Sequence, residues 1–358
     1  MSGRQTFLRD KPYEFVPLLR ECRKEKYYGH HVMEEDTYAG KLKLKLTTLS
    51  PLHIGGNNRD YDTNGNVIIK QMCRNGKAVI PGSSVKGAVR SIAEAVSYSC
   101  AVKLPTPKLA RALPEENAAS CSGIDGKLCI TCTMFGMVNG SRAYKGKVSF
   151  NEFELKSGNL IHESLPKLES PFKDYPDRHD IFGESKGKLT YGNERLYYCR
   201  ACENGNCQDC NKEDFFKHIE MAGAERAMEF RGRKFYSTGR ESTVETNQNT
   251  CYEMLEVGSV LEGEIIFQNL KETEGRLLAY ALDIGNFFTM KLGYGKPLGY
   301  GKVKIELEGV EDLESRYPVG KKISREIVES WGEKYRTDSP DEIQKVIKEF
   351  ERIMGGRR

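Results

Sequence analysis

The sequence predicts an α+β fold of the ferredoxin-like type, in which helices pack on one face of a sheet. Residues 41–46, KLKLKL, alternate strictly between lysine and leucine, which is the pattern of a strand with one buried face. The first half of the chain continues with strands, a helix and a later strand, and the second half has a strand, a helix and a strand. Two units with this order suit a ferredoxin-like core.

The chain on either side of the KLKLKL strand is polar. Residues 1–38 mix charged side chains with scattered tyrosine and histidine, so we expect an irregular N-terminal extension. After the strand, the proline and glycines of residues 50–56, SPLHIGG, end the regular pattern. Residues 57–66, NNRDYDTNGN, then predict a loop rich in turns.

A hairpin and a helix follow this loop. Residues 67–70, VIIK, and 77–80, KAVI, predict short strands, and an Asn-Gly turn precedes the second of them. Residues 81–99 carry apolar side chains at helical spacing after a Pro-Gly break, and Ser83 or Ser84 is expected to cap the helix. A bare helix start of this kind presents backbone N–H groups to an anion.

The second half of the chain surrounds a long insertion. Residues 147–155 predict a strand, whereas residues 156–250 lack a clear apolar pattern and are expected to be inserted. Strands are expected at 257–270 and 302–310, with a helix at 274–288 between them.

The C-terminal tail is expected to end in one helix. Ser339 is placed as its cap, Pro340 as its first residue and Glu342 as the partner in a capping box. The chain therefore divides into an N-terminal extension (1–38), a core (39–155 and 251–310), an insertion (156–250) and a helical tail (311–358).

Composition argues against a membrane protein and favours metal sites over disulfide bonds. The 358 residues carry a formal net charge of +4, and no run of about 18 apolar residues could span a membrane. The N-terminus lacks the apolar core of a secretory signal, so a cytoplasmic protein is expected. In a reducing cytoplasm, clusters among the eleven cysteines indicate metal binding.

The stronger cysteine cluster lies in the insertion. Two CxxC pairs are separated by four residues, which suits a tetrahedral structural Zn²⁺ site, with an iron–sulfur cluster as the alternative. The ligands would be Cys199, Cys202, Cys207 and Cys210.

A second, weaker cluster precedes the insertion. Cys121, Cys129 and Cys132 are its candidate ligands, and Cys100 or the distant His53 would supply the fourth. The three cysteines outside both clusters are expected to be ordinary buried thiols: Cys22, Cys73 and Cys251.

Residues 292–302, LGYGKPLGYGK, repeat the letters L-G-Y-G-K. Glycine allows a backbone to approach a ligand closely, and lysine neutralises phosphate. A dinucleotide site requires a strand before the glycines and a helix after them, whereas here a helix precedes and a strand follows. A nucleotide cradle is therefore disfavoured, while a surface turn and an RNA contact remain open.

Three stretches in this order resemble one protein family. SPLHIGG (50–56), IPGSSVKGAVR (80–90) and LGYGKPLGYGKVKI (292–305) together are similar to the RAMP superfamily, the RNA-binding proteins of CRISPR effector complexes. The CxxCxxFG stretch (129–136) is another piece familiar from that superfamily.

Two further stretches narrow the resemblance. RGRKFY (231–236) and PYEFVPL (12–18) look like a branch found in type III-D and the related type VII systems. The resemblance implies an RRM-like RAMP fold whose zinc-binding insertion forms a thumb between guide and target RNA. The residues that it implies in RNA contact are His53, Gly55, Ser83, Ser84, Lys86, Arg90, Arg231, Arg233, Lys234, Lys291, Gly293, Tyr294, Gly295, Lys296, Gly299, Gly301 and Lys302.

The implied function is a CRISPR RNA-binding backbone subunit that polymerises along a guide RNA and presents it to target RNA. Other effector subunits, including a separate nuclease, would bind it. In type III backbone subunits an aspartate after the first strand supports target cleavage. Here Asp60 and Asp62 lie nearby in a different pattern, and solvated turn residues are the better interpretation. A metal-assisted endoribonuclease and a single-copy capping subunit are the alternatives.

Overall fold

The computed structural model describes residues 12–19, 21–100, 121–168, 197–198, 229–230, 232–239, 249–313 and 320–356. Its main element is an eight-stranded antiparallel sheet in the order β19-β20-β3-β18-β12-β7-β6, in which β11 also pairs with β18. The strands are β3 (Tyr38–Thr48), β6 (Cys73–Arg74), β7 (Lys77–Ile80), β11 (Val148–Phe150), β12 (Phe153–Ser157), β18 (Val260–Leu270), β19 (Met290–Lys291) and β20 (Lys302–Asp312).

β3 lies between β18 and β20 and confirms the strand predicted from KLKLKL. Leu42, Leu44 and Leu46 are buried on one face, each at 1% exposure or less. On the other face, Lys41 and Lys45 form ion pairs with glutamates of β18 and β20. The alternation therefore separates the apolar core from a charged outer surface.

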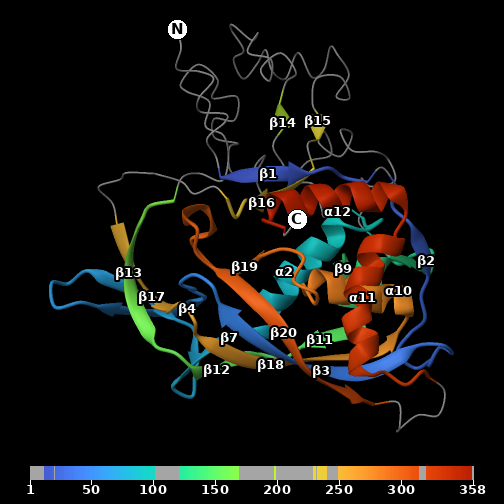
Figure 1. Ribbon diagram of the computed structural model, residues 1–358, viewed down its shortest axis with the longest axis horizontal. Coiled ribbons are helices and arrows are strands. Elements are labelled where there is room, and N and C mark those ends of the chain that lie inside the picture. Colours follow the sequence, from blue (N-terminus) through green and yellow to red (C-terminus); the bar gives the residue numbers. More distant parts are fainter. Residues whose placement is uncertain are drawn as a thin grey trace, which may run out of the picture.

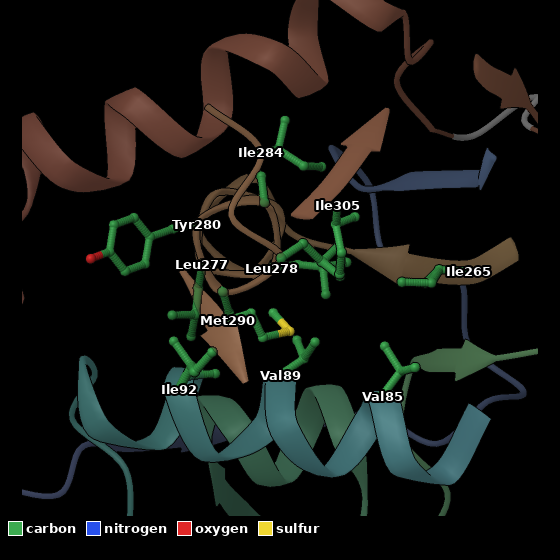
Figure 2. Packing of buried hydrophobic residues seen from close by; sticks show 14 of the residues in the cluster. Val85, Val89, Ile92, Ile265, Leu277, Leu278, Tyr280, Ile284, Met290 and Ile305 are labelled. Atoms are coloured by element: carbon green, nitrogen blue, oxygen red, sulfur yellow. The ribbon is translucent and has the colours of Figure 1, made fainter. Parts of the chain in front are cut away.

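The main helices are α2 (Gly82–Ala95), α10 (Glu272–Ala281), α11 (Arg325–Asp338) and α12 (Asp341–Ile353). Figure 1 shows α2, α10 and α11 grouped on one side of the central sheet. In the buried cluster, Val89 of α2 points towards Met290 of β19, and Val85 lies on the side of Ile265 of β18 (Figure 2). This arrangement confirms the predicted α+β class.

A second sheet has four strands in the order β13-β17-β5-β4. They are β4 (Gly55–Tyr61), β5 (Val67–Gln71), β13 (Leu160–Pro166) and β17 (Asn249–Leu255). The prediction of a loop at 57–66 is wrong for 57–61, which lie in β4 and pair with β5. β4 is a largely exposed edge strand, so it lacks the apolar alternation by which strands are recognised. The pairing of β13 with β17 brings the two ends of residues 156–250 together.

Over the residues described, the N-terminal segment before Tyr38 is mostly without regular structure, but it contains two short strands that were not predicted. β1 (Tyr13–Val16) pairs with β16 (Arg233–Tyr236), and β2 (Lys24–Lys26) pairs with β8 (Lys127–Cys129). These strands are short, and each depends on a partner distant in sequence. Local periodicity therefore could not reveal them.

The start of α2 also differs from the prediction. Pro81 is the N-cap, and within the described residues no side chain, including those of Ser83 and Ser84, caps this helix. Gly82 instead packs against β11, where an added Cβ would lie 2.1 Å from the carbonyl oxygen of Phe150. The first turn of α2 is thus packed closely against the sheet at Gly82 and has no side-chain cap among the described residues.

Two predicted elements are shorter than expected. The helix at 274–288 ends at Ala281, because Asp283 and Asn286 adopt left-handed backbones with φ of 60° and 58°. The Asp283 carboxylate accepts hydrogen bonds from the next turn of backbone, at 2.6 Å from the nitrogen of Phe287. The strand at 147–155 is split into β11 and β12.

The tail holds two helices where one was predicted. α11 was not expected, and Ser324 caps it by accepting from the N–H of Ile327 at 3.4 Å. Ser339 is the C-cap of α11 and Pro340 is the N-cap of α12, so the predicted capping box with Glu342 is wrong. The predicted apolar stripe of α12 is confirmed by the buried Ile343, Val346, Ile347 and Phe350.

The remaining elements are short: α5 (Ile130–Phe135), β9 (Met137–Asn139), β10 (Arg142–Tyr144), β14 (Tyr197–Tyr198), β15 (Glu229–Phe230) and the 3₁₀ helix η2 (Lys296–Leu298). Among the described residues, every helix is too short or too polar to cross a membrane.

Candidate RNA interface and metal centre

Two of the sequence motifs meet in what we call the loop junction, formed by residues 49–56 and 292–302. Backbone hydrogen bonds join the two segments. The N–H of Tyr294 donates to the carbonyl of His53 at 3.0 Å, and the N–H of Gly301 donates to the carbonyl of Pro51 at 3.0 Å. The two predicted RNA-contacting loops therefore form one continuous structure, although they are far apart in sequence.

The glycines of the junction have left-handed backbones that other residues adopt only with strain. Positive φ angles occur at Gly293 (70°), Gly295 (76°), Gly299 (85°) and Gly301 (77°). A Cβ at Gly293 would lie 2.2 Å from the carbonyl oxygen of His53, and one at Gly301 would lie 1.9 Å from that of Leu292. Gly293 and Gly301 are therefore required for packing inside the junction. From the sequence alone, this structural role could not be distinguished from a close approach of the backbone to RNA.

Three aromatic rings pack together at the junction. Tyr294 stacks on Tyr252 of β17, with ring centroids 4.7 Å apart and planes 25° from parallel. The buried His53 meets both rings edge-on, at 5.1 Å from Tyr252 and 6.4 Å from Tyr294. Tyr294 is therefore engaged with protein. Tyr252 is a junction residue that the sequence analysis missed, because it stands in no motif.

The lysines of the motifs lie in two kinds of environment. Lys291 is buried and donates from Nζ to the carbonyls of Ser237 at 2.8 Å and Lys296 at 3.3 Å, so it holds the turn in place. Lys86 in α2 and Lys296 in η2 are half-buried, and burial lowers the pKa of both ammonium groups. In the described part of the chain, neither has a carboxylate partner. A desolvated cation without a counter-ion favours an anionic ligand.

Arg90 and Arg233, also predicted to contact RNA, belong to a buried ion-pair network. Both bind one carboxylate, with Arg90 Nε 2.7 Å from Glu94 Oε1 and Arg233 Nη1 2.9 Å from Glu94 Oε2. Arg90 Nη1 also donates to the carbonyl of Gly136 at 2.9 Å. Lys234 is buried beside the Tyr13 ring, 4.5 Å from its centroid. Internal contacts account for these side chains, and their contact with RNA stays a prediction.

A buried cluster of four cysteines forms the candidate metal centre. The sulfur atoms of Cys100, Cys121, Cys129 and Cys132 all lie within 4.8 Å of one another. Cys100 therefore completes this cluster, whereas His53 lies in the loop junction. Cys100 Sγ is 3.7 Å from the sulfurs of Cys129 and Cys132. A tetrahedron with Zn–S bonds of about 2.3 Å has edges of about 3.8 Å, so the separations suit a metal of this size.

The electrostatics of the cluster favour a thiolate at one of its four sulfurs, that of Cys129. Hydrogen bonds from the thiols of Cys100, Cys121 and Cys132 hold the pKa of Cys129 below its usual range. Arg90 Nη2 lies 3.9 Å from Cys132 Sγ and offers positive charge to a thiolate. The donor set of four sulfurs is the one that Zn²⁺ and iron–sulfur clusters prefer.

The expectation that the remaining cysteines are ordinary buried thiols is wrong. Cys73 is exposed, and Cys22 and Cys251 are only half-buried. Cys22 packs against the metal centre, and its hydrogen bond to Cys129 raises its pKa. Proximity to the cluster could not be read from the sequence, because Cys22 reaches it through the pairing of β2 with β8.

A comparison with protein families identifies the superfamily of this fold. The family model of the RAMP superfamily matches residues 45–304, which span the loop junction, α2 and the metal centre. The chain belongs to the RAMP superfamily. It is therefore a CRISPR-associated RNA-binding subunit, since RAMP proteins bind CRISPR RNA and act in multi-subunit complexes. No curated protein matches the chain significantly.

The weak catalytic candidates of this RAMP protein lie on the β4–β5 hairpin. The Asp62 carboxylate accepts hydrogen bonds at 2.8 Å from the backbone of Asn64 and from the backbone and side chain of Asn66. Hydrogen bonds from Asn66 lower the pKa of Asp62. Asp60 is exposed and lies 3.9 Å from Lys70 Nζ. These contacts agree with the interpretation of Asp62 as a turn residue.

The other predicted site residues are distributed as follows. Gly55 and Ser83 are exposed, whereas Ser84 and Lys302 are half-buried. Arg231 and the four cysteines of the insertion, Cys199, Cys202, Cys207 and Cys210, lie outside the described residues.

Proposed function

We propose that this RAMP protein is a backbone subunit of an RNA-guided effector complex of the type III or type VII kind. Copies of the chain would assemble along a guide RNA, hold its sugar–phosphate backbone and leave its bases free to pair with target RNA. Sequence specificity then comes from base pairing, and the protein contacts only features shared by every guide.

The observation that carries the proposal is the environment of Lys86 and Lys296. The two lysines come from separate motifs, and each is half-buried without a carboxylate partner among the described residues. The phosphates of an RNA strand would supply the missing negative charge. A structural turn alone has no need of a desolvated ammonium group.

We further propose that Zn²⁺ occupies the cluster of Cys100, Cys121, Cys129 and Cys132. The ion would act as a cross-link between the end of α2, β8 and α5, and would take no part in chemistry on RNA. The cysteines of the insertion, Cys199, Cys202, Cys207 and Cys210, are proposed as a second structural site.

Native mass spectrometry of the chain co-expressed with a CRISPR array tests this function. We expect a particle with one guide RNA, several copies of the chain and at least one Zn²⁺ per copy. A particle without RNA would contradict the proposal, and a single copy per guide would instead favour a capping subunit.

The same particle, incubated with complementary RNA and Mg²⁺ but no other nuclease, is expected to leave that RNA intact. Regularly spaced products that disappear in Asp60→Ala or Asp62→Ala would establish an endoribonuclease and overturn the non-catalytic assignment.

A further inference from the structure

The imidazole of His53 is fixed in one orientation inside the loop junction. Its Nδ1 lies 2.7 Å from the carbonyl oxygen of Glu253 on β17. A carbonyl can only accept a hydrogen bond, so Nδ1 carries the proton. Burial lowers the pKa of His53 and outweighs the opposing effect of this hydrogen bond. The ring is therefore neutral near pH 7, and Nε2 is left as a hydrogen-bond acceptor.

This acceptor lies beside the backbone of Gly55. Within the described residues Nε2 has no hydrogen-bond partner, and Tyr252 and Tyr294 flank the ring. A Cβ at the exposed Gly55 would lie 3.7 Å from Nε2, in van der Waals contact with it. His53 is 2% exposed and its neighbour Gly55 is exposed, so Nε2 lies just beneath the surface of the junction.

The chemistry of Nε2 selects its ligand. A phosphate has only acceptor oxygens, and an acceptor nitrogen repels it. The sugar–phosphate backbone of RNA carries one hydrogen-bond donor at each internal nucleotide, the ribose 2′-hydroxyl, and DNA lacks it. It also occurs in every nucleotide, so its recognition does not depend on guide sequence.

We propose that His53 Nε2 accepts a hydrogen bond from a guide ribose 2′-hydroxyl and makes the loop junction selective for RNA over DNA. This inference rests on the proposed function and assigns the sugar contact within the same interface. Lys86 and Lys296 would hold phosphates of either nucleic acid, and His53 would distinguish the sugar.

The test compares the affinity of the full-length chain for a labelled RNA and for the same sequence with 2′-fluoro sugars. The 2′-fluoro strand keeps an RNA-like sugar pucker but has no 2′ donor. His53→Asn keeps an amide that can donate to the Glu253 carbonyl and removes the acceptor. Gly55→Ala leaves His53 intact and places a methyl group 3.7 Å from Nε2, while Gly56→Ala adds the same methyl group beside Lys70 and Met72 as the matched control.

The wild-type chain and Gly56→Ala are expected to bind RNA more tightly than the 2′-fluoro strand. In His53→Asn and Gly55→Ala this ratio of the two affinities should fall by about fivefold, the effect of one hydrogen bond. An unchanged ratio in both variants would overturn the inference. A loss that follows base identity and is equal on both strands would assign Nε2 to a base amine and also overturn it. No binding of either strand by the wild type would overturn the proposed function itself.

Discussion

Positive side chains are treated differently in two regions of this protein. Around the metal centre, Arg90 and Arg233 share the buried carboxylate of Glu94, and Arg90 also reaches Cys132. At the start of α2 and in the loop junction, Lys86 and Lys296 are half-buried without a carboxylate partner among the described residues. In the first region the arginines are paired with a carboxylate of the protein, whereas in the second the lysine ammonium groups are available to an anionic ligand.

Under the proposed function, this difference would separate residues that maintain the fold from residues that bind RNA, although one family motif contains both kinds. Lys86 and Arg90 lie four residues apart on α2, and both were predicted as phosphate contacts from IPGSSVKGAVR. Their surroundings differ, and we propose different roles for them. Variants in the metal region should therefore lose stability, and variants at the lysines should lose affinity for RNA.

The largest effect is expected from loss of a metal ligand. Cys129→Ser should lower the free energy of unfolding by about 4 kcal/mol and release bound Zn²⁺, because Cys129 is fully buried among the other sulfurs. Chemical denaturation with metal analysis measures both quantities. The exposed Cys73→Ser is the control and should stay within about 0.5 kcal/mol of wild type. Equal stability of the two variants would show that the cluster holds no structural metal.

A smaller loss is expected from the arginine network. Arg233→Met should lower the free energy of unfolding by about 3 kcal/mol, because it leaves the buried Glu94 with one cation instead of two. Lys86→Met is the comparison and should be nearly neutral, because no carboxylate partner is lost. Denaturant titration of both variants measures the difference. If Lys86→Met were the more damaging change, the division between the two regions would be wrong.

Sequence reasoning succeeded where local pattern and burial coincide. The alternation of residues 41–46 and the apolar stripe of α12 each state which face is buried, and both agree with the structure. It failed for the exposed edge strand β4 and for the short strand β1, whose pairing depends on β16. Neither of these strands carries a periodic signal of its own.

The site could be predicted as a set of motifs but not as an arrangement. The repeated glycines and SPLHIGG were recognised, but their interlocking depends on backbone contacts between distant segments. The choice of Cys100 over His53 depends on where α2 ends relative to β8. The pairing of Arg90 with Glu94 is an i,i+4 helical pair that local pattern could have indicated. That Arg233 from β16 binds the same carboxylate could not be read from the sequence, because it depends on a distant segment.

The salt dependence of RNA binding tests the central claim most directly. Affinity for a guide-length RNA would be measured from low to high salt for Lys86→Met/Lys296→Met and for a charge-matched control, Lys43→Met/Lys345→Met, which removes two exposed lysines. The slope of log affinity against log salt should fall in magnitude by about 1.4 in the first variant, about 0.7 for each lost phosphate contact, with little change in the control. Equal slopes for the two double variants would contradict the assignment of Lys86 and Lys296 to RNA phosphates.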